Sequence, residues 1–518
     1  MYVKSINIEN LRCFRSAELE LQYAGRKQGQ GQQPILSNIN LLVGDNGTGK
    51  TSVLRSLALA ALSPVMPQSG FLPYRLVRRA GKEEIRESKI SAEVFLHAQD
   101  LGLRNLDKPR SGRLSMKIGR RGANDDILLP GESMPSEEDP IWEKMYEESS
   151  AFFVVGYGAT RRVEEAKNID ISAQQKARRL RYQRVASLFE PIVALVPLSY
   201  WLPALEKKDK ERYKQVVEII NQILPDEASF TGEYEDEAYL FEVNGVNTPF
   251  DALSDGYRAY VGWVADLLYH LCTGEISRGK LTDSVGIVLV DEIDLHLHPE
   301  WQRSATASLS VAFPNLQFVF TTHSPIVAGS LNRENIFVME TDHDSGESSI
   351  SQYQEKIYGL DADSVLLSSY FNLKTTRAET FTSELLDLYS EAVSNKKDRH
   401  EEATFDKEAY FAVADKLSDA TPSPTDLRES LTTERRDERR KQLVFVGPSD
   451  MVLRKRPRVL LSIVAAIFLA LWAVGMLIAR FSVNSGLTLG GYIHVLLGSA
   501  LIILAEVAVL ALSRRSTK

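Results

Sequence analysis

The sequence has little cysteine and no recognisable export signal. Its two cysteines, Cys13 and Cys272, lie far apart beside apolar or aromatic residues, which is typical of reduced core thiols and not of a disulfide framework. Residues 1–14 lack the apolar run and the small-residue cleavage site of a signal peptide, and they alternate between apolar and polar as a strand does. We therefore expect the body of the protein to lie in the reducing cytoplasm.

An excess of positive charge is also missing. The net charge is −8, and because residues 452–518 hold eight Lys or Arg and one Asp or Glu, the first 451 residues carry −15. Such an acidic body does not indicate a general nucleic-acid binder. The local exception is residues 176–184, for which both a solvated helix face and a surface that follows a nucleic-acid backbone remain open. Five basic residues make up this run: Lys176, Arg178, Arg179, Arg181 and Arg184.

Two long apolar stretches near the end of the sequence differ from this body. Residues 459–479 hold no charge, and as a helix they span about 31 Å, which matches the hydrocarbon thickness of a bilayer. Residues 491–512 form a second stretch, broken by Glu506, and an intramembrane carboxylate is a functional candidate. Basic residues flank both outer ends and only Arg480 lies between, so the positive-inside rule predicts a two-span hairpin in the inner (cytoplasmic) membrane. The body and both termini are then cytoplasmic, and either a plain anchor or a working pore fits.

A glycine-rich segment, GDNGTGKTS, follows a predicted buried strand and opens an apolar helix that runs to about Leu62. It completes the spacing G-x-x-x-x-G-K-[ST], in which backbone N–H groups and the helix N-terminus hold phosphate. Lys50 then reaches the β and γ oxygens of ATP, and Thr51 ligates Mg²⁺. We therefore predict ATP and Mg²⁺ as cofactors of this phosphate loop. Its residues are Gly44, Asp45, Asn46, Gly47, Thr48, Gly49, Lys50, Thr51 and Ser52.

The segment GIVLVDEID, residues 286–294, predicts a second buried strand that ends in acidic residues. Asp291 is expected to ligate the magnesium ion. Glu292 is expected to activate the attacking water, because a carboxylate one residue beyond the metal ligand can polarise water for in-line attack on the γ-phosphate. Together with Lys50, these residues predict an ATPase that forms ADP and phosphate.

Five motifs occur in an order that resembles ABC-type ATPases of the SMC, RecF and OLD group, especially bacterial predicted AAA-family ATP-binding proteins. The motifs are INIENLRCF, GDNGTGKTS, LSDGYR, VDEIDLHLHP and TTHSP, within residues 1–340. The resemblance implies a homodimer in which Ser254 and Gly256 of LSDGYR, the signature motif, contact the γ-phosphate bound to the other protomer. It also implies that Asp294 belongs to a loop crossing the dimer interface, and that His323 senses the γ-phosphate in catalysis.

Some positions depart from that pattern. Asp255 and Tyr257 replace the Gly and Gln of the transporter-type signature, and no Gln follows a strand where a magnesium-sensing loop is expected. YGATRR, residues 157–162, is the best positional substitute for that loop. His296 and His298 do not share a helix face, so we favour a turn typical of the resembling proteins over a metal site.

The sequence as a whole predicts an α/β fold: an ABC-type P-loop ATPase head with a helical insertion, a helical stalk and a C-terminal two-helix transmembrane hairpin. The predicted units are an N-terminal lobe at 1–62, an insertion of mixed strands and helices at 63–250, a C-terminal lobe at 251–380, a charged stalk or linker at 381–453, and the hairpin at 454–518.

A membrane-anchored dimeric ATP switch is the function that this arrangement favours, with hydrolysis by Glu292 releasing the two heads. Resembling ATPases of bacterial antiphage systems suggest a defence-type sensor whose hairpin perturbs the membrane, and an unidentified partner protein remains open. One alternative is a membrane-tethered DNA-repair or DNA-maintenance ATPase of RecF or OLD type. A transporter is another, although two spans per chain offer few polar residues to line a substrate path.

Overall fold

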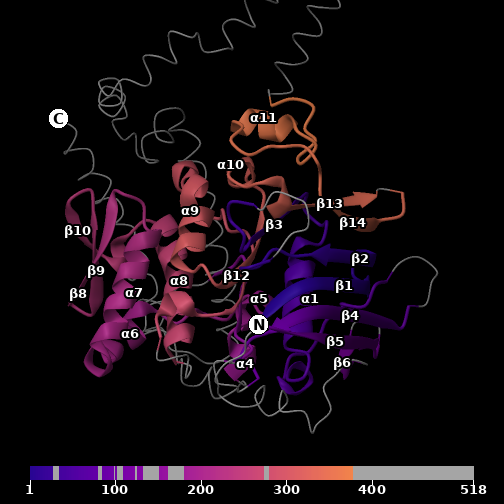
Figure 1. Ribbon diagram of the computed structural model, residues 1–518, viewed down its shortest axis with the longest axis horizontal. Coiled ribbons are helices and arrows are strands. Elements are labelled where there is room, and N and C mark those ends of the chain that lie inside the picture. Colours follow the sequence, from indigo (N-terminus) through magenta and orange to yellow (C-terminus); the bar gives the residue numbers. More distant parts are fainter. Residues whose placement is uncertain are drawn as a thin grey trace, which may run out of the picture. The chain divides into compact units, whose positions relative to one another are not determined.

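The computed structural model divides the chain into two compact units, Met1–Arg377 and Ala378–Lys518, and the first contains every residue described below (Figure 1). The described residues are 1–26, 34–79, 85–98, 100–101, 109–122, 125–131, 151–161, 180–273, 279–342 and 344–376. The predicted stalk at 381–453 and the hairpin at 454–518 lie outside them. The domain boundaries predicted above remain predictions.

A six-stranded sheet, in the order β14–β13–β3–β12–β11–β7, forms the centre of the first unit. Its strands are β3 (Ile39–Gly44), β7 (Val154–Tyr157), β11 (Gly286–Val290), β12 (Leu316–Thr322), β13 (Ile336–Asp342) and β14 (Glu347–Ser351). All neighbours pair in parallel except β13 with β14. Strands β11 and β12 are buried throughout, as expected for parallel strands covered on both faces. Their carboxyl ends lie at one edge of the sheet.

A second, antiparallel sheet has the order β2–β1–β4–β5–β6. Its strands are β1 (Tyr2–Leu11), β2 (Phe14–Glu20), β4 (Glu87–Leu96), β5 (Arg110–Arg120) and β6 (Asp126–Pro130). Strand β4 buries every second residue, which is the pattern of a sheet with one face in a core. Thus the segment predicted as an insertion, 63–250, contributes β4, β5 and β6 to this sheet and β7 to the parallel one.

Helix α1 (Lys50–Ala61) contacts strands of both sheets. Its residues Val53, Leu54 and Leu57 share a core with Leu42 and Leu289, which point from one face of the parallel sheet. Leu41, Val288 and Phe318 belong to a second core on the other face, because adjacent residues of a strand point in opposite directions. The phosphate loop therefore begins in a strand that is fixed on both sides.

The second core is completed by helices and a three-stranded sheet, and Figure 1 shows this sheet beside α7. These elements are α6 (Leu198–Lys208), α7 (Lys210–Ile223), β8 (Ala228–Glu235), β9 (Ala238–Val243), β10 (Val246–Pro249), α8 (Asp255–Thr273) and α9 (Pro299–Ala312). On α7, Val216, Ile219, Ile220 and Ile223 are buried at helical spacing, and Asp209 caps its first turn by accepting from the N–H of Arg212. Shorter helices are α4 (Leu180–Gln183), α5 (Ala186–Phe189), α10 (Pro325–Gly329) and α11 (Ala362–Leu367).

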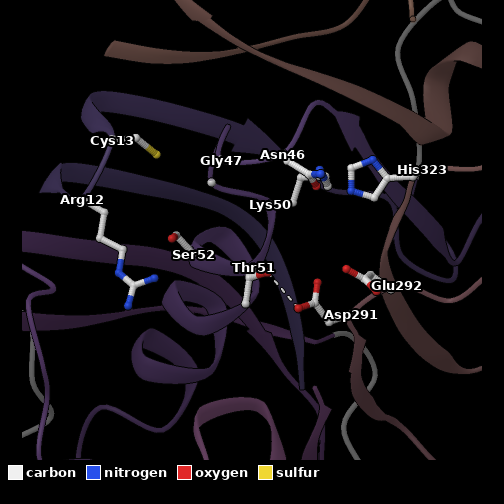
Figure 2. A pocket seen from close by; sticks show the side chains of 11 residues that line it. Arg12, Cys13, Asn46, Gly47, Lys50, Thr51, Ser52, Asp291, Glu292 and His323 are labelled. Carbon is white, nitrogen blue, oxygen red and sulfur yellow. Dashed lines mark hydrogen bonds between the residues drawn. The ribbon is translucent and has the colours of Figure 1, made fainter. Parts of the chain in front are cut away.

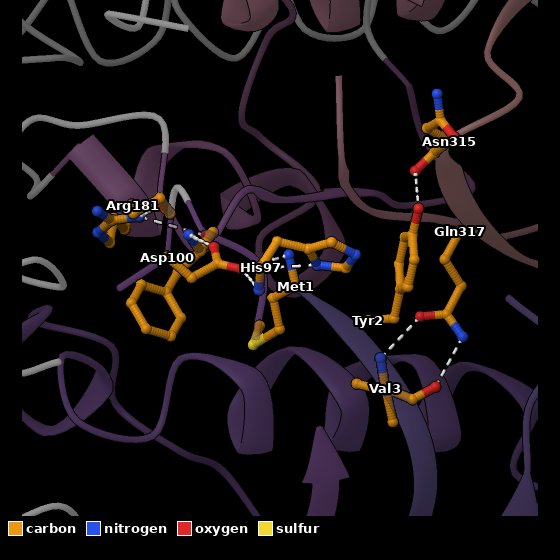
Figure 3. Close-up of polar contacts among 10 residues, drawn as sticks. Met1, Tyr2, Val3, His97, Asp100, Arg181, Asn315 and Gln317 are labelled. Carbon is orange, nitrogen blue, oxygen red and sulfur yellow. Dashed lines mark hydrogen bonds and ion pairs between the residues drawn. The ribbon is translucent and has the colours of Figure 1, made fainter. Parts of the chain in front are cut away.

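The start of β1 is held by polar contacts that Figure 3 draws together. The Met1 ammonium lies 2.7 Å from Asp100 Oδ2, and both groups are completely buried. Asp100 also accepts hydrogen bonds from the backbone N–H groups of Phe152 (2.7 Å) and His97 (2.9 Å). Burial opposes ionisation of Asp100, but the ammonium and these bonds outweigh it and lower the pKa of the carboxyl. Nearby, Gln317 exchanges two hydrogen bonds with the backbone of Val3, which joins β1 to β12.

The basic run is partly inside the protein. The Arg181 guanidinium donates to the carbonyl oxygens of Ala151 and Phe152, and that of Arg184 lies 5.1 Å from the centre of the Phe153 ring. Both arginines are buried, and burial lowers the pKa of Arg184 to about 10. Neither side chain therefore lies on a solvated helix face or on a nucleic-acid surface, because both stabilise the core. Lys176, Arg178 and Arg179 are outside the described residues.

The predicted location in the inner membrane is wrong on the present finding. Among the described residues, no helix has both the length and the apolar character needed to cross a bilayer. The segments on which that prediction depended, 459–479 and 491–512 with Glu506, lie outside the described part of the chain.

Candidate functional site

A pocket of about 260 Å³ lies at the carboxyl edge of the parallel sheet (Figure 2). Three segments line it: the turn between β1 and β2, the phosphate loop, and the ends of β11 and β12. Figure 2 shows Asp291, Glu292 and His323 on the opposite side from Arg12 and Cys13. The complete lining is Arg12, Cys13, Asn46, Gly47, Gly49, Lys50, Thr51, Ser52, Asp291, Glu292 and His323. The pocket thus joins the predicted phosphate loop to the predicted catalytic residues, about 240 positions away in the sequence.

The phosphate loop needs glycine at two positions. Gly44 has φ 150° and Gly49 has φ 101°, which lie in a region that side chains disfavour. A Cβ atom at Gly44 would be 2.3 Å from the carbonyl oxygen of Met339, and one at Gly49 would be 2.5 Å from Cys13 Sγ. The loop can therefore pack this closely against β13 and the β1–β2 turn only with glycine in both places.

Lys50 is held inside the curve of the loop. Its ammonium donates to the carbonyl oxygens of Gly44 (2.6 Å) and Asp45 (2.9 Å). Burial lowers the pKa of Lys50, while the carboxylates of Asp291 and Glu292, among others, oppose that effect. The residue places a positive charge beside the N-terminus of α1, where both the helix dipole and backbone N–H groups favour an anion.

The donor set at the end of β11 fits a magnesium ion. Thr51 Oγ1 donates to Asp291 Oδ2 over 2.8 Å, as the dashed line in Figure 2 shows. Thr321 Oγ1 donates to the other carboxylate oxygen, Oδ1, over 2.7 Å. A hydroxyl and a carboxylate that meet at a pocket wall are the hard oxygen donors that Mg²⁺ prefers. The structure thus brings the two predicted metal ligands, Thr51 and Asp291, together at the pocket wall, and their binding of Mg²⁺ stays a prediction.

Glu292 has a left-handed backbone, with φ 50°. Its N–H donates to Thr321 Oγ1 over 2.7 Å, and its carbonyl oxygen accepts from Arg161 Nη2 over 2.7 Å. Burial lowers the pKa of Arg161 to about 10, and the carboxylates of Asp291 and Asp294 act against this. Arg161 belongs to YGATRR, so the structure brings this substitute loop to the acidic turn Asp291–Glu292.

Sequence reasoning missed Thr321. The residue is the last but one of a buried strand, and its hydroxyl gives no periodic signal of function. The one available clue was that TTHSP follows a strand parallel to the one carrying the acidic turn, so its first hydroxyl lies at the same sheet edge.

The signature residues do not line this pocket. Ser254 is exposed just before α8, and Gly256 lies in the first turn of that helix. A Cβ atom at Gly256 would be 2.5 Å from the carbonyl oxygen of His296, so the helix start packs directly on the segment after the acidic turn. In that segment Asp294 accepts a hydrogen bond from Thr322 Oγ1 over 2.5 Å. The roles of Ser254, Gly256, Asp294 and His323 toward nucleotide remain predictions.

The two histidines of VDEIDLHLHP take part in a turn. His298 caps α9, because its Nδ1 accepts from the backbone N–H of Glu300 over 3.4 Å. His296 has φ 65°, a left-handed turn conformation. These contacts agree with the preference for a turn over a metal site.

Two family models match the chain. Residues 1–96 match the AAA ATPase domain, and residues 169–328 match a family described as "AAA domain, putative AbiEii toxin, Type IV TA system". The first range contains the phosphate loop, and the second contains the signature motif, the acidic turn and His323.

Curated relatives cover most of the chain. It is 24% identical over 432 residues to the Septu protein PtuA of Bacillus mycoides, a match that covers 83% of this chain and 52% of that protein. It is 24% identical over 408 residues to the Retron Ec83 probable ATPase of Escherichia coli, covering 65% of this chain and 71% of the relative. Over 96 residues it is 38% identical to the Retron Vc95 probable ATPase of Vibrio cholerae, covering 18% and 19%. The chain thus spans about half the length of the Bacillus relative.

Solved structures similar to this chain include SMC heads. An SMC head bound to the C-winged helix domain of ScpA aligns with 68% of this chain and 98% of its own, at 12% identity and a TM-score of 0.41. The SMC head domain from Thermotoga maritima aligns with 68% and 100%, at 12% identity and a TM-score of 0.37. The pocket and the two ATPase family matches, rather than these alignments, confirm the predicted α/β P-loop head: the chain is an ATP-hydrolysing enzyme.

Proposed function

We propose that the chain is a dimeric ATP switch of a bacterial defence system, in which two heads close around ATP and open after hydrolysis. The observation that supports a dimer is the position of the signature motif. The pocket unites the phosphate loop with the acidic turn, whereas Ser254 lies outside it, exposed at the start of a 19-residue helix. A helix start in that position can present its N–H groups to the phosphates of ATP in a second copy.

Hydrolysis follows from the residues that face the pocket. Lys50 and the N–H groups of the phosphate loop hold the β- and γ-phosphates. A bound Mg²⁺, held by Thr51 and Asp291, would offset negative charge on the phosphate oxygens. Glu292 orients a water molecule and accepts its proton, while the water oxygen bonds to the γ-phosphorus and the bond to the β-phosphate oxygen breaks. The leaving group is ADP, and His323, which lines the same pocket, has the proposed role of contacting the γ-phosphate.

The defence role has a separate basis. Relatives over 65% to 83% of the chain are a retron ATPase and a Septu protein, and the shorter match at the N-terminus is again a retron ATPase. The same head on bacterial proteins of these two kinds supports a switch that reports or executes a defence response. A protein partner belongs to this proposal, because a head that opens and closes needs something to act on.

The dimer is tested by complementation between two inactive full-length variants. Ser254→Arg should bind ATP but not hydrolyse it, and Lys50→Ala should lack the phosphate-binding lysine. Mixed together, they should recover part of the wild-type rate, because one composite site then has an intact loop and an intact signature. Ser229→Arg, at an exposed position on β8, serves as the control for adding an arginine. A mixture no faster than its components would contradict the dimer.

The biological role is tested by phage challenge. Cells carrying the full-length chain with its neighbouring genes should reduce phage plating, and Lys50→Ala should abolish that protection at equal protein level. Protection that survives in Lys50→Ala cells would show that ATP binding is not what drives the response, whereas absence of protection against every phage tested would remove the defence role.

A further inference from the structure

Two residues, Thr321 of TTHSP and Arg161 of YGATRR, hold the acidic turn through the two backbone groups of Glu292. Glu292 has φ 50°, a conformation that a side chain makes unfavourable and that neighbours must stabilise. Both hydrogen-bonding groups of its backbone are used. Thr321 Oγ1 accepts from the N–H, and Arg161 Nη2 donates to the carbonyl oxygen, each over 2.7 Å. The same carbonyl oxygen also accepts from the backbone N–H of Leu295 over 3.1 Å.

The Thr321 hydroxyl acts both as a hydrogen-bond donor and as a hydrogen-bond acceptor here. Its single proton goes to Asp291 Oδ1, so an oxygen lone pair is left to accept from the N–H of Glu292. The side chain is completely buried, which removes competition from solvent. With Oδ1 of Asp291 fixed in this way, Oδ2 is directed toward Thr51 and the proposed metal position. Thr321 therefore orients the metal ligand and the proposed base at once.

Arg161 makes a hydrogen bond to only one of these two residues, Glu292. Its Nη2 donates to the Glu292 carbonyl, while its Nη1 is buried with no hydrogen-bond partner within the described part of the chain. Three carboxylates of residues 291–294 attract the guanidinium electrostatically, in the order Asp291, Asp294, Glu292. This attraction keeps a half-buried cation beside the acidic turn, and among the described residues the guanidinium makes no hydrogen bond to the Asp291 oxygens.

We propose that Thr321 and Arg161 are positioning residues of the hydrolysis reaction, Thr321 for both Asp291 and Glu292, and Arg161 for Glu292. This assignment rests on the proposed Mg²⁺-ATP site. It predicts different signatures for the two residues. Loss of the Thr321 hydroxyl should both weaken magnesium binding and lower turnover, whereas loss of the Arg161 guanidinium should lower turnover without weakening magnesium binding.

The test uses the full-length protein with Thr321→Val, Thr321→Ser and a matched control, Thr306→Val. Thr306 is a completely buried threonine on α9 whose hydroxyl meets only Ser330 Oγ, at 3.4 Å, among the described residues. For each protein we would measure kcat, KM for ATP, the Mg²⁺ concentration at half-maximal rate, and the thermal unfolding midpoint. A second readout, independent of turnover, is the affinity for a fluorescent ATP analogue in Mg²⁺ and in EDTA.

Thr321→Val should lower kcat about 10- to 100-fold and should raise the half-saturating Mg²⁺ concentration, because second-sphere groups of a metal site have effects of that size. Its affinity for the analogue in EDTA should stay at the wild-type value, while its affinity in Mg²⁺ should fall. Thr321→Ser, which keeps the hydroxyl, should recover most of both losses. If Thr321→Val does not fold, Thr321→Ala also lacks the hydroxyl and takes its place. Values within twofold of Thr306→Val for kcat and Mg²⁺ dependence would overturn the assignment of Thr321.

Arg161→Met should lower kcat, because the Glu292 carbonyl loses this donor, without raising the half-saturating Mg²⁺ concentration or weakening analogue binding in Mg²⁺, since removal of a cation beside Asp291 favours Mg²⁺ there. An unchanged kcat would overturn the role of Arg161, and a raised half-saturating Mg²⁺ concentration would contradict its restriction to Glu292. Failure of the proposed function looks different: wild-type protein would then be inactive at every Mg²⁺ concentration. In that case the analogue affinities still decide whether Thr321 supports a metal site.

Discussion

Asp291 and Asp100 are both buried beside a cation, but Asp291 belongs to the candidate ATP site whereas Asp100 stabilises the fold. Asp291 is 5% exposed and Asp100 is completely buried, and each lies near a cation, Lys50 in one case and the Met1 ammonium in the other. The partners of Asp100 are an ammonium and two backbone N–H groups, all inside the chain. Those of Asp291 are two hydroxyls, and one of them, on Thr51, lines the pocket. A buried carboxylate thus indicates a catalytic or binding role when some of its hydrogen-bond partners face a cavity. It indicates a structural role when all of its partners are inside the protein.

The largest expected effect concerns the pocket side of this comparison. Glu292→Gln should lower the rate of ATP hydrolysis about 10²- to 10⁴-fold, because the amide cannot accept the proton of the attacking water. Binding of ATP should persist, since Lys50, Thr51 and Asp291 are unchanged. The measurement is steady-state phosphate release together with equilibrium nucleotide binding, and Glu300→Gln in the first turn of α9 is the matched control. A Glu292→Gln protein with the wild-type rate would show that the base lies elsewhere.

The second prediction concerns Asp100. Asp100→Asn should lower the free energy of unfolding by about 3 to 5 kcal/mol, because it leaves the Met1 ammonium buried without its counter-charge. Chemical denaturation measures this value, and Asp125→Asn at an exposed position serves as the control. The folded fraction should still hydrolyse ATP at the wild-type rate per molecule. A large loss of kcat with little loss of stability would erase the distinction between the two aspartates.

The same contrast explains what could be predicted from the sequence. Residues 44–52 and 286–294 combine a fixed spacing with a preceding buried strand, so both the P-loop head and ATP hydrolysis were predicted, and both are confirmed. Asp100 carries no such signal, because its partners are backbone groups and a terminus that only the folded chain brings together. Thr321 was missed for a similar reason, since its role depends on the register of β12 against β11.

The limits of pattern reading are visible in two further places. The segment that holds β4, β5 and β6 was predicted as part of an insertion, and that boundary stays a prediction. Alternation identifies a strand such as β4 but not its partner, and only the fold pairs β4 with β1. Arg181 and Arg184 were read by charge alone, although an arginine can be buried when carbonyl oxygens and aromatic rings surround it. The inner-membrane location rested on apolar length in a part of the chain outside the described residues, and it is corrected above.

A third prediction concerns the start of α8, which packs on the segment after the acidic turn but does not line the pocket. Gly256→Ala should destabilise the protein by about 1 to 3 kcal/mol, because the added Cβ lies 2.5 Å from the His296 carbonyl oxygen and the start of α8 must shift. Gly122→Ala, where a Cβ has nothing within 4 Å, is the matched control and should change stability little. Denaturation midpoints measure both. Equal midpoints for the two variants would show that α8 does not depend on this close contact.

The smallest expected effect is on the pH dependence of stability, and it comes from His97, which lies near the Met1 ammonium and Asp100. Burial, followed by repulsion from the Met1 ammonium, lowers the pKa of His97 from 6.5 to about 4, against attraction to Asp100. As the pH falls below 6.5, the unfolded chain therefore binds a proton that the folded chain does not, and stability that is complete above 6.5 is lost toward pH 4. Between pH 7 and pH 6 this residue should account for a loss of about 0.7 kcal/mol.

Comparing the wild type with His97→Gln isolates that contribution, because the remaining histidines titrate in both proteins and cancel. The pKa of Asp100 is lowered from 3.8, so its own contribution is lost only in more acidic solution and does not overlap with the interval from pH 7 to pH 6. Denaturation curves at both pH values should therefore show a smaller decrease in the free energy of unfolding for His97→Gln than for the wild type. Equal decreases would mean that His97 titrates alike in the folded and unfolded chains, so that neither its burial nor the neighbouring ammonium opposes its protonation.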